Sequence, residues 1–140
     1  MPKLLLAALG LIVLAGCSPG PTPVAVPSPA PEVAAACAQL VKALPEKVLD
    51  ANRRKTEPAS PLTTAYGDPP IEVTCGVSPP AGMADAQSQC FEVNGVVFTT
   101  IGRTLYLEVA VPSKYKPEAN ALTDVSDVVH RYNKLVTPCI

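Results

Sequence analysis

Apolar side chains recur at helical spacing in two segments of the chain. In the first segment, which opens with Pro31, the apolar positions are Val33, Cys37, Leu40, Val41 and Leu44. In the second, which opens with Pro117, they are Leu122, Val125, Val129, Tyr132 and Val136. Such stripes cover one face of a helix, and proline suits the first helical turn because an N–H there has no helical partner. We expect a helix in each segment, and a shorter one over residues 45–54 with Val48 and Leu49 facing inward.

Alternating apolar and polar residues between the two helices predict strands. In residues 71–77 the apolar positions are Ile71, Val73, Cys75 and Val77, and in residues 104–111 they are Leu105, Leu107, Val109 and Val111. Residues 91–93 and 96–101 flank Asn94-Gly95, a dipeptide typical of two-residue hairpin turns. We expect a second two-residue turn at Gly102-Arg103, leading into the last strand.

The order helix, strands, helix predicts an α+β domain of two layers. Each predicted strand has one apolar face, so a small antiparallel sheet would bury that face under the two helices. The opposite face of the sheet is then expected to remain uncovered, and the two helices to lie side by side.

The first 17 residues follow a different pattern. Lys3 precedes an apolar run over residues 4–14, and small residues then lead to Cys17. A positive start, a short apolar run and small residues are typical of an export signal, and the run is shorter than the roughly 20 residues that span a bilayer. Leu14-Ala15-Gly16-Cys17 resembles the bacterial lipobox, in which the cysteine is lipidated and becomes the new N-terminus. We expect an anchor at Cys17, which two acyl chains would hold on the extracytoplasmic face of the cell membrane; an ordinary signal peptide is the alternative.

The next segment is rich in proline, with six prolines among the fourteen residues 18–31. Proline lacks a backbone donor, so this segment is expected to be an extended tether that packs no core, reaching on the order of 40 Å at ~3.1 Å per residue. A ligand for a proline-binding domain is the alternative. The predicted organisation is a signal peptide over residues 1–16, a lipidated cysteine and tether over residues 17–32, and one domain over residues 33–140.

Composition narrows the function classes. The chain has 11 basic and 12 acidic residues and a formal net charge of −1, which argues against a nucleic-acid binder and a polybasic membrane binder. Apolar residues make up 48% of the chain, and part of this content belongs to the signal.

Four cysteines remain in the domain: Cys37, Cys75, Cys90 and Cys139. An even count in an exported domain predicts two disulfides, and four cysteines allow three pairings. We favour Cys75 with Cys90, because the glycines and prolines between them indicate a turning loop, and therefore Cys37 with Cys139. No Cys-x-x-Cys occurs and His130 is the one histidine, so neither a metal site nor thiol exchange is expected.

Candidate chemistry is sparse, and no cofactor is expected. His130 falls on the polar side of its helix, so we expect it to be exposed and assign it no catalytic role. We assign no catalytic residue in this chain. Glu72, Glu92 and Glu108 fall opposite the apolar positions of their strands. They either form the solvent-exposed face of the sheet or include a carboxylate pair for glycoside hydrolysis. A pocket joining two of them would favour the hydrolase, and a flat face would argue against it. Arg53-Arg54-Lys55 is either a solvated helix end or a contact for anionic lipid headgroups or wall-polymer phosphates.

Six short segments, taken together, resemble one protein family. They are Tyr66-Gly67-Asp68-Pro69-Pro70, Cys75-Gly76-Val77, Cys90 with Val93-Asn94-Gly95-Val96, Phe98-Thr99-Thr100 with Gly102-Arg103, Val111-Pro112 with Tyr115, and Pro138-Cys139. The family is the actinobacterial domain of unknown function thirty-five fifteen, made of small exported or lipid-anchored envelope proteins. The resemblance implies an envelope location and supports the framework of four cysteines, but it implies no activity.

These observations predict a membrane-anchored, non-enzymatic envelope lipoprotein that binds a protein partner or a wall component. We expect the binding face to lie on the uncovered side of the sheet, at Arg103, Tyr106 and Glu108. The alternatives are an envelope hydrolase that uses the carboxylates on that face, and a purely structural wall component.

Overall fold

The computed structural model describes residues 19–81, 91–94 and 96–138. Its elements, in chain order, are β1 (Thr22–Pro23), α1 (Pro31–Ala43), β2 (Lys47–Val48), β3 (Ala51–Arg54), β4 (Thr56–Glu57), β5 (Thr63–Tyr66), β6 (Ile71–Cys75), β7 (Phe91–Asn94), β8 (Val97–Thr100), β9 (Leu107–Ala110) and α3 (Asn120–Tyr132).

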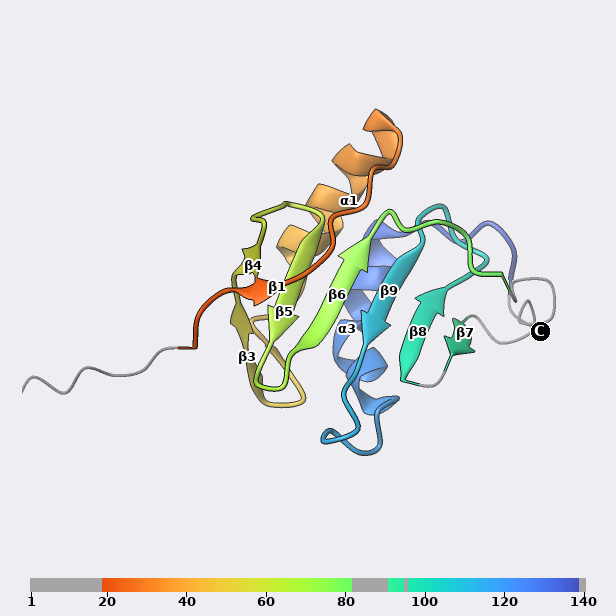
Figure 1. Ribbon diagram of the computed structural model, residues 1–140. Coiled ribbons are helices and arrows are strands. Elements are labelled where there is room, and N and C mark those ends of the chain that lie inside the picture. The colour runs from red at the N-terminus through yellow and green to blue at the C-terminus, as the bar shows by residue number, and fades with distance from the viewer. Residues whose placement is uncertain (1–18, 82–90, 95, 139–140) are drawn as a thin grey trace, which may run out of the picture.

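The main sheet is antiparallel throughout, in the order β2-β3-β5-β6-β9-β8-β7. Strand β2 pairs only with β3, and the other six strands form the body of the sheet, with β6 and β9 at its centre. Both helices lie on one face (Figure 1). The predicted α+β architecture is therefore confirmed, and we call the face opposite the helices the front face.

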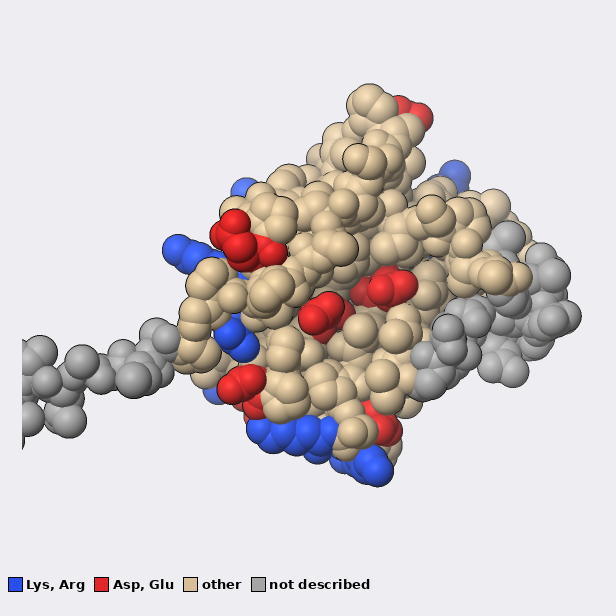
Figure 2. Space-filling view, in the orientation of Figure 1, with Lys and Arg blue, Asp and Glu red and all other residues tan. Residues whose placement is uncertain are grey.

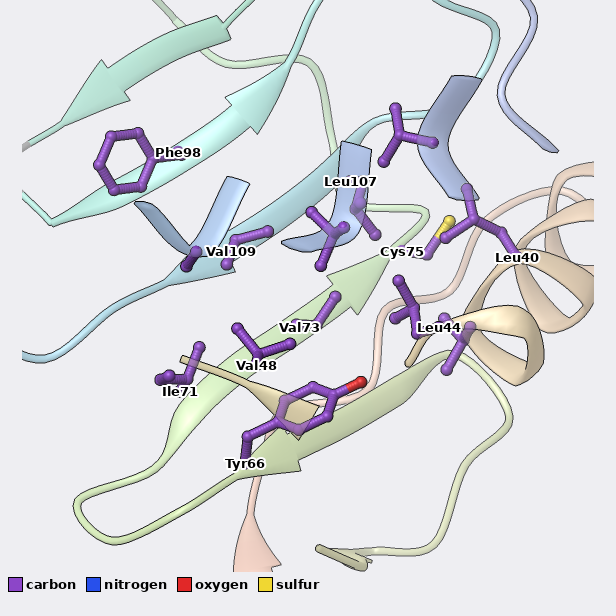
Figure 3. Packing of buried hydrophobic residues seen from close by; sticks show 14 of the residues in the cluster. Leu40, Leu44, Val48, Tyr66, Ile71, Val73, Cys75, Phe98, Leu107 and Val109 are labelled. Carbon is purple, nitrogen blue, oxygen red and sulfur yellow. The ribbon is translucent and has the colours of Figure 1, made fainter. Parts of the chain in front are cut away.

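The core lies between the sheet and the helices. The two central strands contribute Ile71, Val73, Leu107 and Val109, each 0% exposed. Figure 3 shows these side chains in one layer with Leu40 and Leu44 from the end of α1. Fully burying one such side chain stabilises the fold by about 1.5–3 kcal/mol, so the alternation predicted for β6 and β9 accounts for much of the core.

Among the residues whose burial the structure describes, Tyr66 is the largest fully buried side chain, and its hydroxyl has a hydrogen-bond partner. The Tyr66 hydroxyl donates to the Pro45 carbonyl oxygen at 2.9 Å. Burial raises the pKa of this phenol to about 12, so it stays a neutral donor at physiological pH.

The prediction of a helix over residues 45–54 is wrong, because this segment forms the hairpin β2–β3. Leu49 and Asp50 both have positive φ, 48° and 62°, as a tight turn between antiparallel strands requires. The Leu49 N–H donates to Asp124 Oδ2 of α3 at 2.7 Å. A contact across 75 residues thus supports a turn that the local sequence does not indicate.

Two other turns differ from the expectation. Asn94 pairs with Val97 and ends β7, so it belongs to the strand rather than to the expected turn. The expected turn at Gly102-Arg103 is instead a longer connection over residues 101–106. It is closed by Thr100, whose hydroxyl donates to the Leu105 carbonyl and accepts from the Leu107 N–H, both at 2.9 Å.

The second predicted helix is confirmed, but part of its predicted apolar stripe is wrong. Val125 and Val129 are buried, whereas Tyr132 is 39% exposed and Val136, beyond the helix, is 63% exposed. The position after the helix is taken by Asn133, which is 0% exposed. Its side chain accepts from the Leu105 N–H at 2.9 Å and donates to the Leu105 carbonyl at 2.8 Å.

The one disulfide within the described residues joins Cys37 of α1 to Cys75 at the end of β6, with a Cα–Cα distance of 5.4 Å. Both predicted pairings, Cys75 with Cys90 and Cys37 with Cys139, are therefore wrong. The physical reason is that α1 packs against the end of β6, which brings Cys37 to Cys75 and buries both completely. Cys90 and Cys139 themselves lie outside the described residues.

The proline-rich segment differs from the expected free tether. Residues 19–30, which we call the N-terminal segment, cross the front face before α1 begins (Figure 1). The Thr22 N–H donates to the Lys55 carbonyl at 2.9 Å and the Val24 N–H to the Glu57 carbonyl at 3.1 Å, so that β1 pairs in parallel with β4. Thr22 and Val24 are only 2% and 5% exposed. The folded part of the chain thus includes residues well before Val33, where the sequence placed its start.

The predicted signal peptide and Cys17 lie outside the described residues. Neither helix in the part of the chain that the structure describes has the length and apolar character needed to cross a bilayer.

Peptide mapping under non-reducing conditions tests the disulfide. We expect digestion with a protease that cleaves before aspartate, which separates Cys75 from Cys90 at Asp85, to release one covalently joined pair of peptides containing Cys37 and Cys75, because the fold places these cysteines in contact. Reduction before digestion is the control and should separate the two peptides. A joined pair containing Cys75 and Cys90 would contradict the structure.

Replacement of Asn133 tests its role beyond α3. We expect Asn133→Ala to lower the free energy of unfolding by about 2 kcal/mol, because the buried Leu105 N–H would lose its partner. Urea denaturation measures the change. Asn52→Ala, at an exposed position of β3, is the control and should change the stability by less than about 0.5 kcal/mol; an equal loss in both variants would contradict this role.

Candidate functional site

Two of the three predicted carboxylates meet on the front face. Glu108 of β9 lies opposite Thr74 of β6, and Glu72 lies opposite Ala110, so the two glutamates are diagonal neighbours on adjacent strands. The backbone positions of diagonal neighbours on adjacent antiparallel strands are about 7–8 Å apart. Glu92 of β7 lies opposite Thr99, which itself lies opposite Glu108, so the register places Glu92 two strands away from Glu108. The backbone register therefore brings Glu72 and Glu108 together, and the Glu92 side chain lies outside the description.

A pocket of about 310 Å³ joins Glu72 and Glu108. We call it the acidic pocket: residues 24–27 of the N-terminal segment line one side, and Glu72, Thr74, Val77, Ser78 and Glu108 line the other. Figure 2 shows acidic groups in the middle of the front face, over β6 and β9, surrounded by uncharged surface. The front face is therefore neither flat nor fully uncovered, because the N-terminal segment forms a wall beside the two carboxylates.

The charges in the acidic pocket are not balanced locally. Within the described part of the chain, neither Glu72 nor Glu108 has an ion pair or a hydrogen bond to its carboxylate. Burial raises the pKa of the Glu72 carboxyl above its usual value of 4.5, and the negative charge of Glu108 raises it further. The pocket thus disfavours its own negative charge and would favour a cation.

Thr74 adds an unpaired polar group to the same pocket. Its side chain is only 9% exposed, it lines the pocket, and it faces Glu108 across the strand pair. Its hydroxyl forms no hydrogen bond with any residue that the structure describes. The residue is buried but its hydroxyl oxygen is still accessible, so the hydroxyl is available to a ligand in the pocket.

Tyr106 lines a second pocket, of about 380 Å³, on the same face. This Tyr106 pocket is also lined by Pro29, Val33 and Thr104, and it shares Pro27, Val77 and Ser78 with the acidic pocket. The structure therefore brings the predicted Tyr106 and Glu108 to neighbouring positions, with the N-terminal segment along both pockets.

Arg103, the third residue of the predicted binding face, lies elsewhere. Its guanidinium donates to the Asn133 carbonyl at 2.7 Å and contacts His130 Nδ1 at 3.1 Å, at the C-terminal end of α3. A cation there stabilises the free carbonyls of the helix end. Arg103 therefore has a structural role, and His130 beside it is exposed, as expected.

The basic run Arg53-Arg54-Lys55 does not end a helix, as one reading of the sequence had it, because Arg53 and Arg54 belong to β3. Arg53 donates to the Val41 and Leu44 carbonyls at the end of α1. Arg54 donates to the carbonyls of Gly67 and Gly20, each at 2.6 Å, and so fixes the start of the N-terminal segment. Both arginines thus stabilise the fold, and contact with lipid headgroups stays a prediction.

The wall formed by residues 24–27 is the part of the site that the sequence did not predict. Its one local signal is Val24-Ala25-Val26, which are apolar and keep their backbone N–H groups among the prolines. No cluster of three His, Cys, Asp or Glu side chains suited to a metal ion occurs among the described residues.

Glu72 gives the site a testable pH dependence. Because its pKa is raised in the folded state, the ionised carboxylate opposes folding, and this cost appears as the pH rises above about 4.5. We expect Glu72→Gln to raise the Tm at pH 7 by up to about 3 °C and to have no effect at pH 3.5. Asp127→Asn, on the exposed side of α3, controls for net charge. An effect of Glu72→Gln that is equal at both pH values would contradict the assignment.

Comparison with known proteins identifies the family. The chain matches no curated protein and no solved structure. A family model described as "Protein of unknown function (DUF3515)" matches residues 3–136, nearly the whole chain. On this match, the chain belongs to the DUF3515 family.

Proposed function

We propose that this protein is a lipid-anchored module of the bacterial cell envelope that binds an envelope partner through its front face. The export signal would be cleaved before Cys17, which would carry the lipid. The family match includes this region, because it begins at residue 3. The Cys37–Cys75 disulfide also fits an oxidising compartment outside the cytoplasm.

The observation that carries the binding function is the acidic pocket. It combines two carboxylates without a counter-ion, the Thr74 hydroxyl without a partner among the described residues, and a wall made by a segment that belongs to neither layer of the fold. The two unpaired carboxylates do not stabilise the domain, and together with the hydroxyl and the wall they form a concave site of the kind that binds ligands. The adjoining Tyr106 pocket extends this site along the front face.

The N-terminal segment also sets the distance from the membrane. Arg54 holds Gly20 and the Lys55 carbonyl holds Thr22, so the folded part begins within five residues of Cys17. Five extended residues span at most about 18 Å. The module would therefore sit close to the bilayer, with no long tether before it, and its partner would be an envelope protein or wall component near the membrane surface.

A hydrolase is the second candidate, and one observation favours it. The acidic pocket joins Glu72 and Glu108, and glycoside hydrolysis needs two carboxyl groups in one pocket. The raised pKa of Glu72 would suit a proton donor, with Glu108 as the base or nucleophile. Against this, the apolar walls of the pocket are valine, alanine and proline, and none of the described residues that line it has an aromatic ring to hold a sugar. At about 310 Å³ the pocket is also at the small end of ligand sites. Binding is the better supported function.

Photo-crosslinking in intact cells tests the binding function. A photoreactive residue at Ser78, which lines both pockets, is expected to capture one defined envelope component. The same residue at Thr123, exposed on α3, is the control and should not capture it. Combining Ser78 labelling with Glu72→Gln and Glu108→Gln should reduce the yield at least about fivefold, if the carboxylates contribute to recognition. Equal yields from Ser78 and Thr123 would contradict a binding role for the front face.

A further inference from the structure

We propose that the acidic pocket binds a primary alkylammonium group, meaning an aliphatic stem that ends in –NH₃⁺. This inference rests on the proposed function and names the chemistry of the ligand group. It follows from three properties of the pocket: its charge, its unpaired acceptors and its apolar walls.

The charge requires a cation. Glu72 and Glu108 are diagonal neighbours on β6 and β9 and line the same pocket. No Lys, Arg or His of the described chain lies among the residues lining the pocket, and none pairs with either carboxylate. A positive group between the two glutamates would attract both carboxylates and offset their mutual repulsion.

The acceptors select the kind of cation. An ammonium group has three donors and no acceptor, whereas guanidinium presents a planar fork that matches a single carboxylate. The acidic pocket offers acceptor oxygens from three side chains, Glu72, Glu108 and Thr74, on two adjacent strands. Thr74 is 9% exposed and its hydroxyl has no partner among the described residues, so the hydroxyl can accept a bond without losing one. Three acceptor groups lining one pocket suit –NH₃⁺.

The walls select the stem. Residues 24–27 supply Val24, Ala25, Val26 and Pro27, and the opposite side adds Val77. Pro27 has no N–H, and the Val24 N–H already donates to Glu57, so these two residues bring no free backbone donor to compete with the ligand. A chain of methylene groups would pack against these side chains while its charged end reaches the carboxylates, as lysine side chains do on protein surfaces.

Titration of the full chain in non-ionic micelles tests the proposal. The probe is n-pentylammonium chloride at pH 7, followed by the NMR shifts of backbone amides in β6 and β9. We expect saturable shifts with a Kd in the millimolar range. Two probes separate the parts of the ligand: 1-pentanol has the stem without the charge, and ammonium chloride has the charge without the stem. Each should bind at least about tenfold more weakly than pentylammonium.

Matched variants locate the site. Glu72→Gln and Glu108→Gln should each weaken binding of pentylammonium about tenfold, and Thr74→Val about threefold, because each removes one acceptor. Asp127→Asn removes the same charge from the helix layer and should leave the Kd unchanged. Amide spectra of the variants show whether each one is folded. If a variant does not fold, the comparison of the three probes on the unaltered chain still tests the proposal.

Two results would overturn the inference: 1-pentanol binding as tightly as pentylammonium, or no saturable shift with pentylammonium. This failure can be told apart from failure of the proposed function. If Ser78 still captures its partner while pentylammonium does not bind, the alkylammonium inference is wrong and the binding function stands. If pentylammonium binds but Ser78 and Thr123 capture equally, the proposed function is wrong and the chemistry of the pocket stands.

Discussion

The covalent link between α1 and the central strand β6 is the constraint on which the rest of this structure depends. Cys37 and Cys75 are both fully buried, and their bond fixes α1 to the sheet at the end of β6. Since α1 begins at Pro31, the N-terminal segment must reach that position from its pairing with β4. Its course crosses the front face (Figure 1). The position of the helix behind the sheet thus determines which residues form a wall in front of it.

Local sequence pattern predicted the parts of this fold that depend on local physics. The alternation of β6 and β9, the stripe of α1 and the two-layer arrangement all follow from which side chains avoid water. The parts it missed depend on contacts between distant residues. The turn at Leu49 and Asp50 is supported by Asp124, and the cysteine pairing is set by where α1 packs. The glycines and prolines after Cys75 indicate a turn, but a turn does not determine which cysteine lies beside another.

In the candidate site too, the local sequence predicted some features, while others depend on contacts between distant residues. Alternation alone placed Glu72 and Glu108 on one face, because the side chains of a strand alternate between its two sides. It could not show that a proline-rich segment returns to that face, since the bonds that hold it join Thr22 to Lys55 and Gly20 to Arg54. Arg103 was misplaced for a related reason: the turn expected there is a longer connection that carries its side chain to the end of α3.

The acidic pocket is costly for the fold, and this cost is itself an argument for function. Burial of Glu72 beside Glu108 opposes folding at neutral pH, and no described residue neutralises the pair. Local rules are broken without compensation mainly at functional sites. The walls, in contrast, are held firmly: the N-terminal segment is bonded to β4 and Arg54 at one end and continues into the disulfide-linked α1 at the other. A pocket whose walls are fixed before the ligand arrives loses little conformational entropy on binding. A rigid wall beside two carboxylates without a counter-ion is therefore the arrangement expected of a preformed cation-binding site.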